Sequence, residues 1–206
     1  MTCFDQERVA KAPLVLGELL EEDGQRFAIV VVGGAAMLLS GAGSRVTVDV
    51  DVIMHVEVSS DMPAGERPTM PRMPSPLPRV LLAAAEQVAK AMQLPGDWLN
   101  RQVSTVWSKE LPPPLLEDGI DWERFGALWV GVVPRRDLIA LKLHALADQA
   151  QIAGKHFDDL CDLRPSNEEL ETAREWVSKQ DLNPAWPVHV ASVAARVRQG
   201  REHARP

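Results

Sequence analysis

Hydrophobic and polar residues alternate one by one between residues 46 and 54, which is the pattern of a half-buried β-strand. The even positions are apolar and read Val46, Val48, Val50, Val52 and Met54. Two of the odd positions are acidic, Asp49 and Asp51. Because successive side chains of a strand point to opposite faces, we expect Val48, Val50 and Val52 to face the core. The two carboxylates then share the other face, with side-chain origins roughly 6–7 Å apart.

Two further apolar runs predict other strands of the same sheet. Residues 27–32 are apolar and stop at Gly33-Gly34, after which we expect a short helix over residues 35–40. Residues 128–133 form the other run, and we expect this strand to lie beside the acidic one.

Helical spacing of apolar residues fills most of the remaining chain. A capping box, in which Ser166 is followed by Glu169, marks the start of one helix. Another helix, after the strand over residues 128–133, carries Lys142. The helix that begins at Ser166 is predicted to cover residues 166–178. Three further helices are predicted over residues 7–21, 79–92 and 187–198.

These elements predict an α/β fold with a short mixed sheet, flanking helices and a C-terminal helical extension. The 206 residues suit one catalytic domain with such an appendage. We expect residues 1–133 to form the α/β core and residues 134–206 to form a helical extension packed on it. The proline-rich stretch over residues 59–78 breaks regular structure and is predicted to be a long loop.

The pair of carboxylates is the first candidate for chemistry. Two carboxylates on one strand face can bind a hard cation such as Mg²⁺ or Mn²⁺. The alternative is an acidic strand face that is simply solvated, because alternation of this kind is found in any half-buried strand. Asp49 and Asp51 are therefore predicted metal ligands, with the solvated face left open.

The glycine pair at the end of the strand over residues 27–32 is the second candidate. Gly33 and Gly34 allow the backbone to approach a phosphate closely, and the helix that follows offers unpaired N–H groups. The alternative is a tight strand-to-helix turn without a ligand. No Gly-Lys-Ser/Thr tripeptide is present, which excludes a P-loop, and Gly41-Ala42-Gly43 lacks the third glycine of a dinucleotide fingerprint.

The order of these signals resembles the nucleotidyltransferase superfamily, in particular its AbiEii toxin-like branch. The matching residues are Gly33, Gly34, Arg45, Thr47, Asp49 and Asp51, in the pattern Gly-Gly…Arg-x-Thr-x-Asp-x-Asp. The resemblance implies that Asp49 and Asp51 are catalytic and hold the metal ion. It also implies that Gly33, Gly34, Arg45 and Thr47 bind the nucleotide.

A second block, residues 137–163, is similar to a later helical motif of that branch. The matches are Lys142, Leu143 and Ala145, followed by Asp159, Leu160, Asp162 and Leu163. Gln149 and Asp158 depart from the pattern, which has basic residues there. The resemblance implies that Lys142 and Asp159 are catalytic and point into the same cleft as Asp51. Residues 95–103 also resemble a Trp-Leu-Asn segment of the close relatives.

The function implied by the resemblance is Mg²⁺-dependent transfer of a nucleotide from a nucleoside triphosphate. The acceptor is RNA, a protein or a small molecule, and a toxin-antitoxin role would add a cognate antitoxin as partner. Many catalytic members place a third carboxylate on a neighbouring strand, and residues 128–132 contain none. A catalytically silent module that binds a protein partner is therefore the alternative.

Charge and hydropathy limit the partners. The net charge is −7 at pH 7, so no broad basic surface for duplex DNA is expected. The longest apolar run, residues 28–39, is too short to span a bilayer, and the first residues do not read as a secretion signal. We therefore expect a cytoplasmic protein without membrane contact.

Overall fold

The computed structural model describes residues 6–43, 46–63, 66–69, 75–103, 119–149 and 152–203. The chain divides into two compact units, Met1–Pro134 and Arg135–Pro206. The first unit contains the sheet, and the described elements of the second are helices. This mixed α/β composition with C-terminal helices confirms the fold class expected from the sequence.

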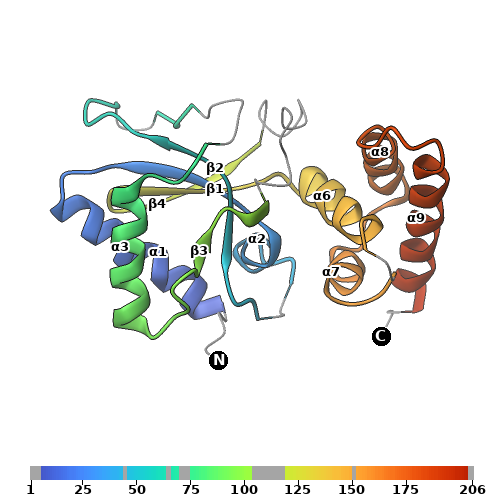
Figure 1. Cartoon of the computed structure of the whole chain (residues 1–206), viewed down its shortest axis with the longest axis horizontal. Coiled ribbons are helices and arrows are strands. Elements are labelled where there is room, and N and C mark those ends of the chain that lie inside the picture. The colour runs from blue at the N-terminus through green and yellow to red at the C-terminus, as the bar shows by residue number, and fades with distance from the viewer. Residues whose placement is uncertain are drawn as a thin grey trace. The chain divides into compact units, whose positions relative to one another are not determined.

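A five-stranded mixed sheet forms the centre of the first unit, in the order β3-β2-β1-β5-β4 (Figure 1). The strands are β1 (Phe27–Val32), β2 (Val50–Glu57), β3 (Leu99–Asn100), β4 (Asp121–Phe125) and β5 (Leu128–Val132). The central strand β1 runs parallel to β5 and antiparallel to β2. At the two edges, β3 is parallel to β2, and β4 forms an antiparallel pair with β5.

Helices pack on one face of this sheet because the strands present alternate apolar side chains there. Ile29 and Val31 of β1 and Val130 of β5 line the same buried space as Leu16, which is fully buried. Trp98, also buried, donates from its indole N–H to the Ala85 carbonyl at 2.8 Å. Figure 1 shows the helices on this side: α1 (Gln6–Glu22), α2 (Gly33–Leu39) and α3 (Arg79–Met92).

The opposite face of the sheet carries a smaller apolar cluster. Ala28 of β1, Trp129 of β5 and Val58, just after β2, are buried together. Met62, from the segment that follows β2, packs against them. The Arg124 guanidinium lies over the Trp129 ring at 4.4 Å from its centroid, a cation–π contact that covers the ring. The part of the predicted 59–78 loop that is described thus shields this face in part.

Two expectations about the acidic strand are wrong. β2 begins at Val50, not at residue 46, and Val48 is 37% exposed instead of facing the core. The physical reason is that β1 ends opposite Asp51, so the β1–β2 ladder does not extend to the residues before Val50. The strand over residues 128–132 pairs with β1, which therefore separates it from the acidic strand.

The second unit is a cluster of helices with its own apolar core. Its described helices are α6 (Arg135–Ala147), α7 (Lys155–Leu163), α8 (Asn167–Val177) and α9 (Trp186–His203). Leu143 of α6, Leu170 of α8 and Val193 of α9 are fully buried. The predicted capping box is present, because the Ser166 hydroxyl accepts from the Glu169 N–H and the Glu169 carboxylate accepts from the Ser166 N–H.

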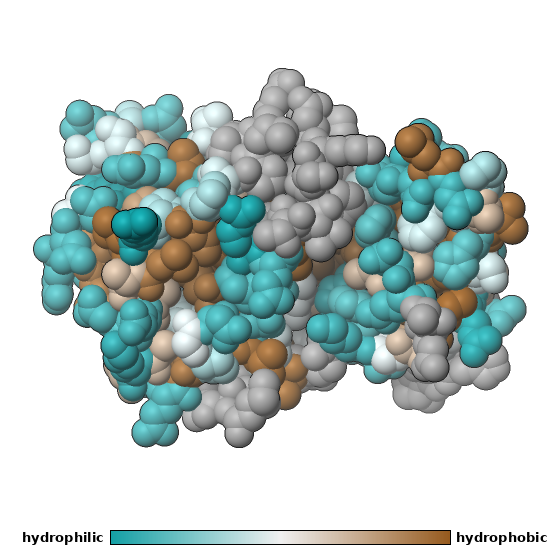
Figure 2. All heavy atoms as spheres, viewed as in Figure 1, coloured by the Kyte–Doolittle hydropathy of each residue, from teal (hydrophilic) through white to brown (hydrophobic). Residues whose placement is uncertain are grey.

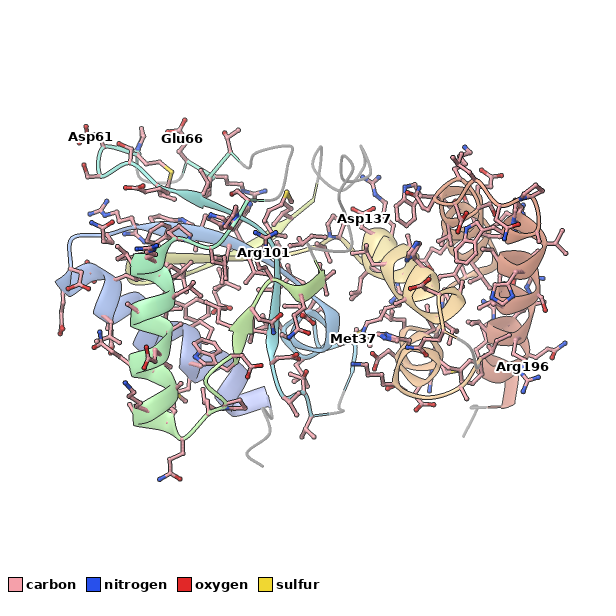
Figure 3. All side chains as sticks on the ribbon, in the orientation of Figure 1. Met37, Asp61, Glu66, Arg101, Asp137 and Arg196 are labelled. Atoms are coloured by element: carbon pink, nitrogen blue, oxygen red, sulfur yellow. The ribbon has the colours of Figure 1, made fainter. Side chains whose placement is uncertain are left out.

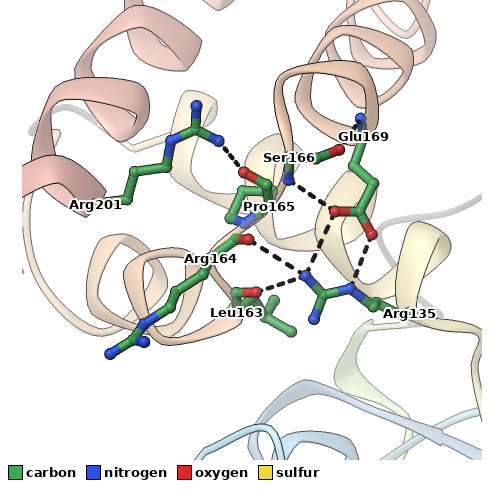
Figure 4. A network of polar contacts seen from close by, with 7 residues as sticks. All are labelled: Arg135, Leu163, Arg164, Pro165, Ser166, Glu169 and Arg201. Atoms are coloured by element: carbon green, nitrogen blue, oxygen red, sulfur yellow. Dashed lines mark hydrogen bonds and ion pairs between the residues drawn. The ribbon is translucent and has the colours of Figure 1, made fainter. Parts of the chain in front are cut away.

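A polar network joins the ends of these helices (Figure 4). Arg135 donates to the Leu163 carbonyl at 2.6 Å and to the Glu169 carboxylate at 2.8 Å. The hydrogen bond from Arg135 is the main reason why the pKa of Glu169 is lowered from its ordinary value. Arg201 of α9 donates to the Pro165 carbonyl. The network satisfies carbonyl groups at and just beyond the C-terminal end of α7, which the helix itself leaves without a donor.

The surface is mixed in character. On the face seen in Figure 2, hydrophobic residues lie between hydrophilic ones over both units. The exposed large apolar side chains include Leu182, at 92%, and Val188, at 73%. None of the helices in the described ranges is long and apolar enough to cross a membrane.

Candidate active site

The acidic residues lie at the end of the strands where β1 stops and β2 begins, and we call this end of the sheet the acidic edge. Val32, the last residue of β1, is opposite Asp51, and Asp51 is in register with Asn100 on β3. Val50 and Leu99 precede these two residues and line the buried space under the helices. Because side chains alternate along a strand, Asp51 and Asn100 point to the opposite face of the sheet.

Gly33 lies directly against the carboxylate of Asp51. Its φ is +71°, and a Cβ atom at this position would lie 2.7 Å from Asp51 Oδ2. That separation is shorter than a side chain tolerates, so the close approach requires glycine. The glycine pair therefore makes room for the acidic residue, and its predicted contact with a nucleotide phosphate remains a prediction.

Asp49 lies just before β2 and is held by two neighbours. The Thr47 hydroxyl is 3.3 Å from both the main-chain carbonyl and Oδ1 of Asp49. The Asn100 amide donates to Asp49 Oδ2 at 3.5 Å, the long end of the hydrogen-bond range. Thr47 is only 6% exposed, so the structure shows its hydroxyl engaged with Asp49, while its predicted contact with the nucleotide stays untested.

Asn100 and Arg101 lie at this edge but were not among the residues predicted from the sequence. Arg101 directly follows β3 and is labelled in Figure 3. Its charge contributes, after burial, to the lowered pKa of His55 on β2, which places a cationic group near this strand. The only signal in the sequence was the Trp-Leu-Asn resemblance, which gives no strand register.

The donor set at this edge fits a hard divalent cation. Asp49 and Asp51 provide carboxylate oxygens, the ligands that Mg²⁺ and Mn²⁺ prefer. Gly33 allows the Asp51 carboxylate to lie closer to the backbone than a side chain at position 33 would permit. Among the described residues no cluster of three or more His, Cys, Asp or Glu side chains is present, so the site offers two carboxylates there.

Lys142 and Asp159 form an ion pair inside the second unit. Lys142 lies on α6 and Asp159 on α7, and the Lys142 amine donates to Asp159 Oδ2. Both side chains are buried, at 4% and 3% exposure. Removing one member of such a pair leaves an uncompensated charge, so the two residues depend on each other. Their predicted meeting with Asp51 stays a prediction.

One predicted residue falls outside the described ranges. Arg45, expected to bind the nucleotide, belongs to the part of the chain that the structure does not describe. Gly34 lies in the first turn of α2, next to Gly33.

Comparison with known proteins agrees with the chemistry of this edge. A family model described as a nucleotidyltransferase of unknown function (DUF6036) matches residues 15–106. The matched range contains Gly33, Asp49, Asp51 and Asn100, which are the residues that the structure brings together. No curated protein and no solved structure matches the chain significantly. The match supports the nucleotidyltransferase superfamily.

Proposed function

We propose that the chain transfers a nucleotide from a nucleoside triphosphate, with Mg²⁺ or Mn²⁺ held by Asp49 and Asp51. One observation carries the proposal: Asp51 lies against Gly33 and in register with Asn100, which also contacts Asp49. Asp51 thus lies at the turn from β1 into α2, and Asp49 is connected to the same end of the sheet through Asn100. The family match over the same residues supports this class of reaction.

In this proposal the residues at this edge have different roles in binding the cation and the triphosphate. The cation, when bound, supplies positive charge against the triphosphate and the leaving pyrophosphate. Asp49 and Asp51 hold it. The backbone N–H groups of Gly33 and Gly34 bind phosphate oxygens, and Arg45 adds a cationic group to them.

The finer assignments follow from the resemblance to AbiEii-type toxins. In this proposal Asp159 orients Lys142 or the acceptor, and Arg45 or Lys142 supplies the cationic group. The acceptor is RNA, a protein or a small molecule, and a cognate antitoxin would be the natural protein partner. The Lys142–Asp159 ion pair supports only the link between these two residues, which are matched positions of the motif.

A second function is a nucleotidyltransferase-like module that binds a partner without catalysis. The described residues contain no third acidic ligand beside Asp49 and Asp51, and this favours the second function. The two functions differ in the nucleotide binding that they predict. An active enzyme with two carboxylates should bind a nucleoside triphosphate together with the cation, whereas a silent module need not.

Titration calorimetry with ATP, GTP, CTP and UTP, each with Mg²⁺ and then Mn²⁺, separates the two functions. We expect one or more triphosphates to bind only with the cation, and labelled nucleotide to be transferred to an acceptor. Asp51→Asn keeps the shape of the side chain but removes its charge, so transfer should fall about a hundredfold or more. Circular dichroism of the variant should be unchanged.

Asp121→Asn is the matched control. Asp121 is an exposed carboxylate on β4, the last strand in the order of the sheet, whereas β3 is the first. The same change of charge there should leave binding and transfer intact. A wild-type protein that binds no triphosphate with either cation would rule out the enzyme and favour the silent module.

A further inference from the structure

Both carboxylate oxygens of Asp49 have a hydrogen-bond donor from the chain itself. Oδ1 is 3.3 Å from the Thr47 hydroxyl, and Oδ2 is 3.5 Å from the Asn100 amide. The donors come from segments far apart in the sequence, brought together by the pairing of β2 with β3. Asp49 itself lies outside the strands, so these two contacts orient its carboxylate.

The orientation of the Asn100 side chain is set by a contact of its own. Its Oδ1 accepts from the Gln102 N–H at 2.9 Å, which assigns the oxygen and the nitrogen of the amide. The nitrogen is then directed to Asp49, and it also reaches the Asp97 carbonyl at 3.4 Å. The side chain at position 100 must therefore accept one hydrogen bond and donate another at the same time. An amide supplies both, whereas a carboxylate would oppose Asp49 with a like charge.

We infer that Asn100 and Thr47 are positioning residues that fix the Asp49 carboxylate for cation binding. Neither residue needs to touch the cation for this role. The inference rests on the proposed function, since it takes Asp49 to be a cation ligand. Partners that orient a metal ligand typically contribute about 10–100-fold to metal affinity. The contribution of Asn100 to cation affinity should therefore depend on the presence of the Asp49 carboxylate.

A double-mutant cycle on Mn²⁺ affinity tests this dependence. Free Mn²⁺ is measured by electron paramagnetic resonance in the wild type, Asn100→Leu, Asp49→Asn and the double variant. We expect Asn100→Leu to weaken Mn²⁺ binding at least about tenfold in the wild-type background. In the Asp49→Asn background the same change should have little further effect.

The possible outcomes separate the inference from the proposed function. Wild-type protein that binds no Mn²⁺ overturns both. Wild-type binding that is unchanged by Asn100→Leu overturns only the positioning role. An equal loss in both backgrounds means that Asn100 supports the fold in general, which also overturns it.

Thr47 provides an independent variant if Asn100→Leu does not fold. Thr47→Val keeps the size of the side chain and loses the hydroxyl, while Thr47→Ser keeps the hydroxyl. We expect Thr47→Val to weaken Mn²⁺ binding and Thr47→Ser to retain it. Equal affinities of the two variants would overturn the positioning role of Thr47.

Discussion

Asp137 is a buried carboxylate near the start of α6, labelled in Figure 3. It is 6% exposed, and its Oδ2 has no hydrogen-bond partner among the described residues. Burial raises the pKa of Asp137 to about 6, although Arg136 opposes the shift with its charge and a hydrogen bond. The protonated form is therefore the one that the folded protein accommodates best.

The raised pKa gives a dependence of stability on pH. Protonated Asp137 stabilises the fold at pH values below about 4, and this contribution is lost as the pH rises through about 6. Asp137→Asn imitates the protonated form, so it should raise the free energy of unfolding by about 1–2 kcal/mol at pH 7.5. This change in the free energy of unfolding is smaller than the free energy that corresponds to the whole pKa shift, because solvent and Arg136 screen the charge.

Thermal unfolding of both proteins between pH 4 and pH 8 measures the effect. The advantage of Asp137→Asn should shrink as the pH falls from about 6 towards 4. Asp162→Asn, at an exposed position of α7, changes the net charge equally and should show no such trend. A constant difference at all pH values would contradict the assignment to Asp137.

At the scale of elements, the turn from β1 into α2 couples backbone conformation to the acidic site. Gly33→Ala introduces a side chain at φ +71° and drives a Cβ against Asp51 Oδ2. The left-handed conformation costs about 1–2 kcal/mol for an L-residue. The Asp51 carboxylate must also turn away, so Mn²⁺ affinity should fall with stability.

Gly24→Ala separates these two effects. Gly24 has φ +66°, and nothing lies within 4 Å of its Cβ position. It should lose a similar amount of stability on chemical denaturation but keep the wild-type affinity for Mn²⁺. If both variants bind Mn²⁺ equally well, the contact between Gly33 and Asp51 does not shape the site.

Local signals in the sequence predicted the elements that depend on local chemistry. The strand over residues 27–32 is apolar throughout, and the capping box at Ser166 is satisfied within one turn, so both are found where expected. β4 was not predicted, because an edge strand with exposed residues lacks a clear apolar pattern. β3 has two residues, too few to form a pattern.

The candidate site shows the same division. Asp49 and Asp51 were identified because they are neighbours on one segment. Asn100 reaches them only through the register of β2 with β3, which sequence spacing does not reveal. The expected position of the strand over residues 128–132 was wrong for a related reason, since strand order depends on pairing between distant segments.

At the scale of the whole molecule, the division at Pro134 predicts that the second unit folds without the first. Its helices contact one another, and its ion pair and capping network lie within residues 135–206. A fragment of residues 135–206 should therefore be helical by circular dichroism and melt cooperatively.

The control is the same fragment with Leu170→Ala. Leu170 is fully buried in α8, and truncating it should cost about 2–5 kcal/mol and lower the melting temperature or abolish the transition. A fragment that is unfolded even without this change would show that the second unit requires residues 1–134.

The central place of β1 has a consequence for the order in which the chain acquires structure. All six residues of β1 are apolar and buried, and one of its two edges is covered only by β5, which lies far later in the chain. Until residues 128–132 leave the ribosome, that edge is an uncharged strand with unpaired N–H and C=O groups. Such an edge recruits other strands. We therefore expect the nascent chain to be most prone to aggregation in the interval between the synthesis of β2 and that of β5.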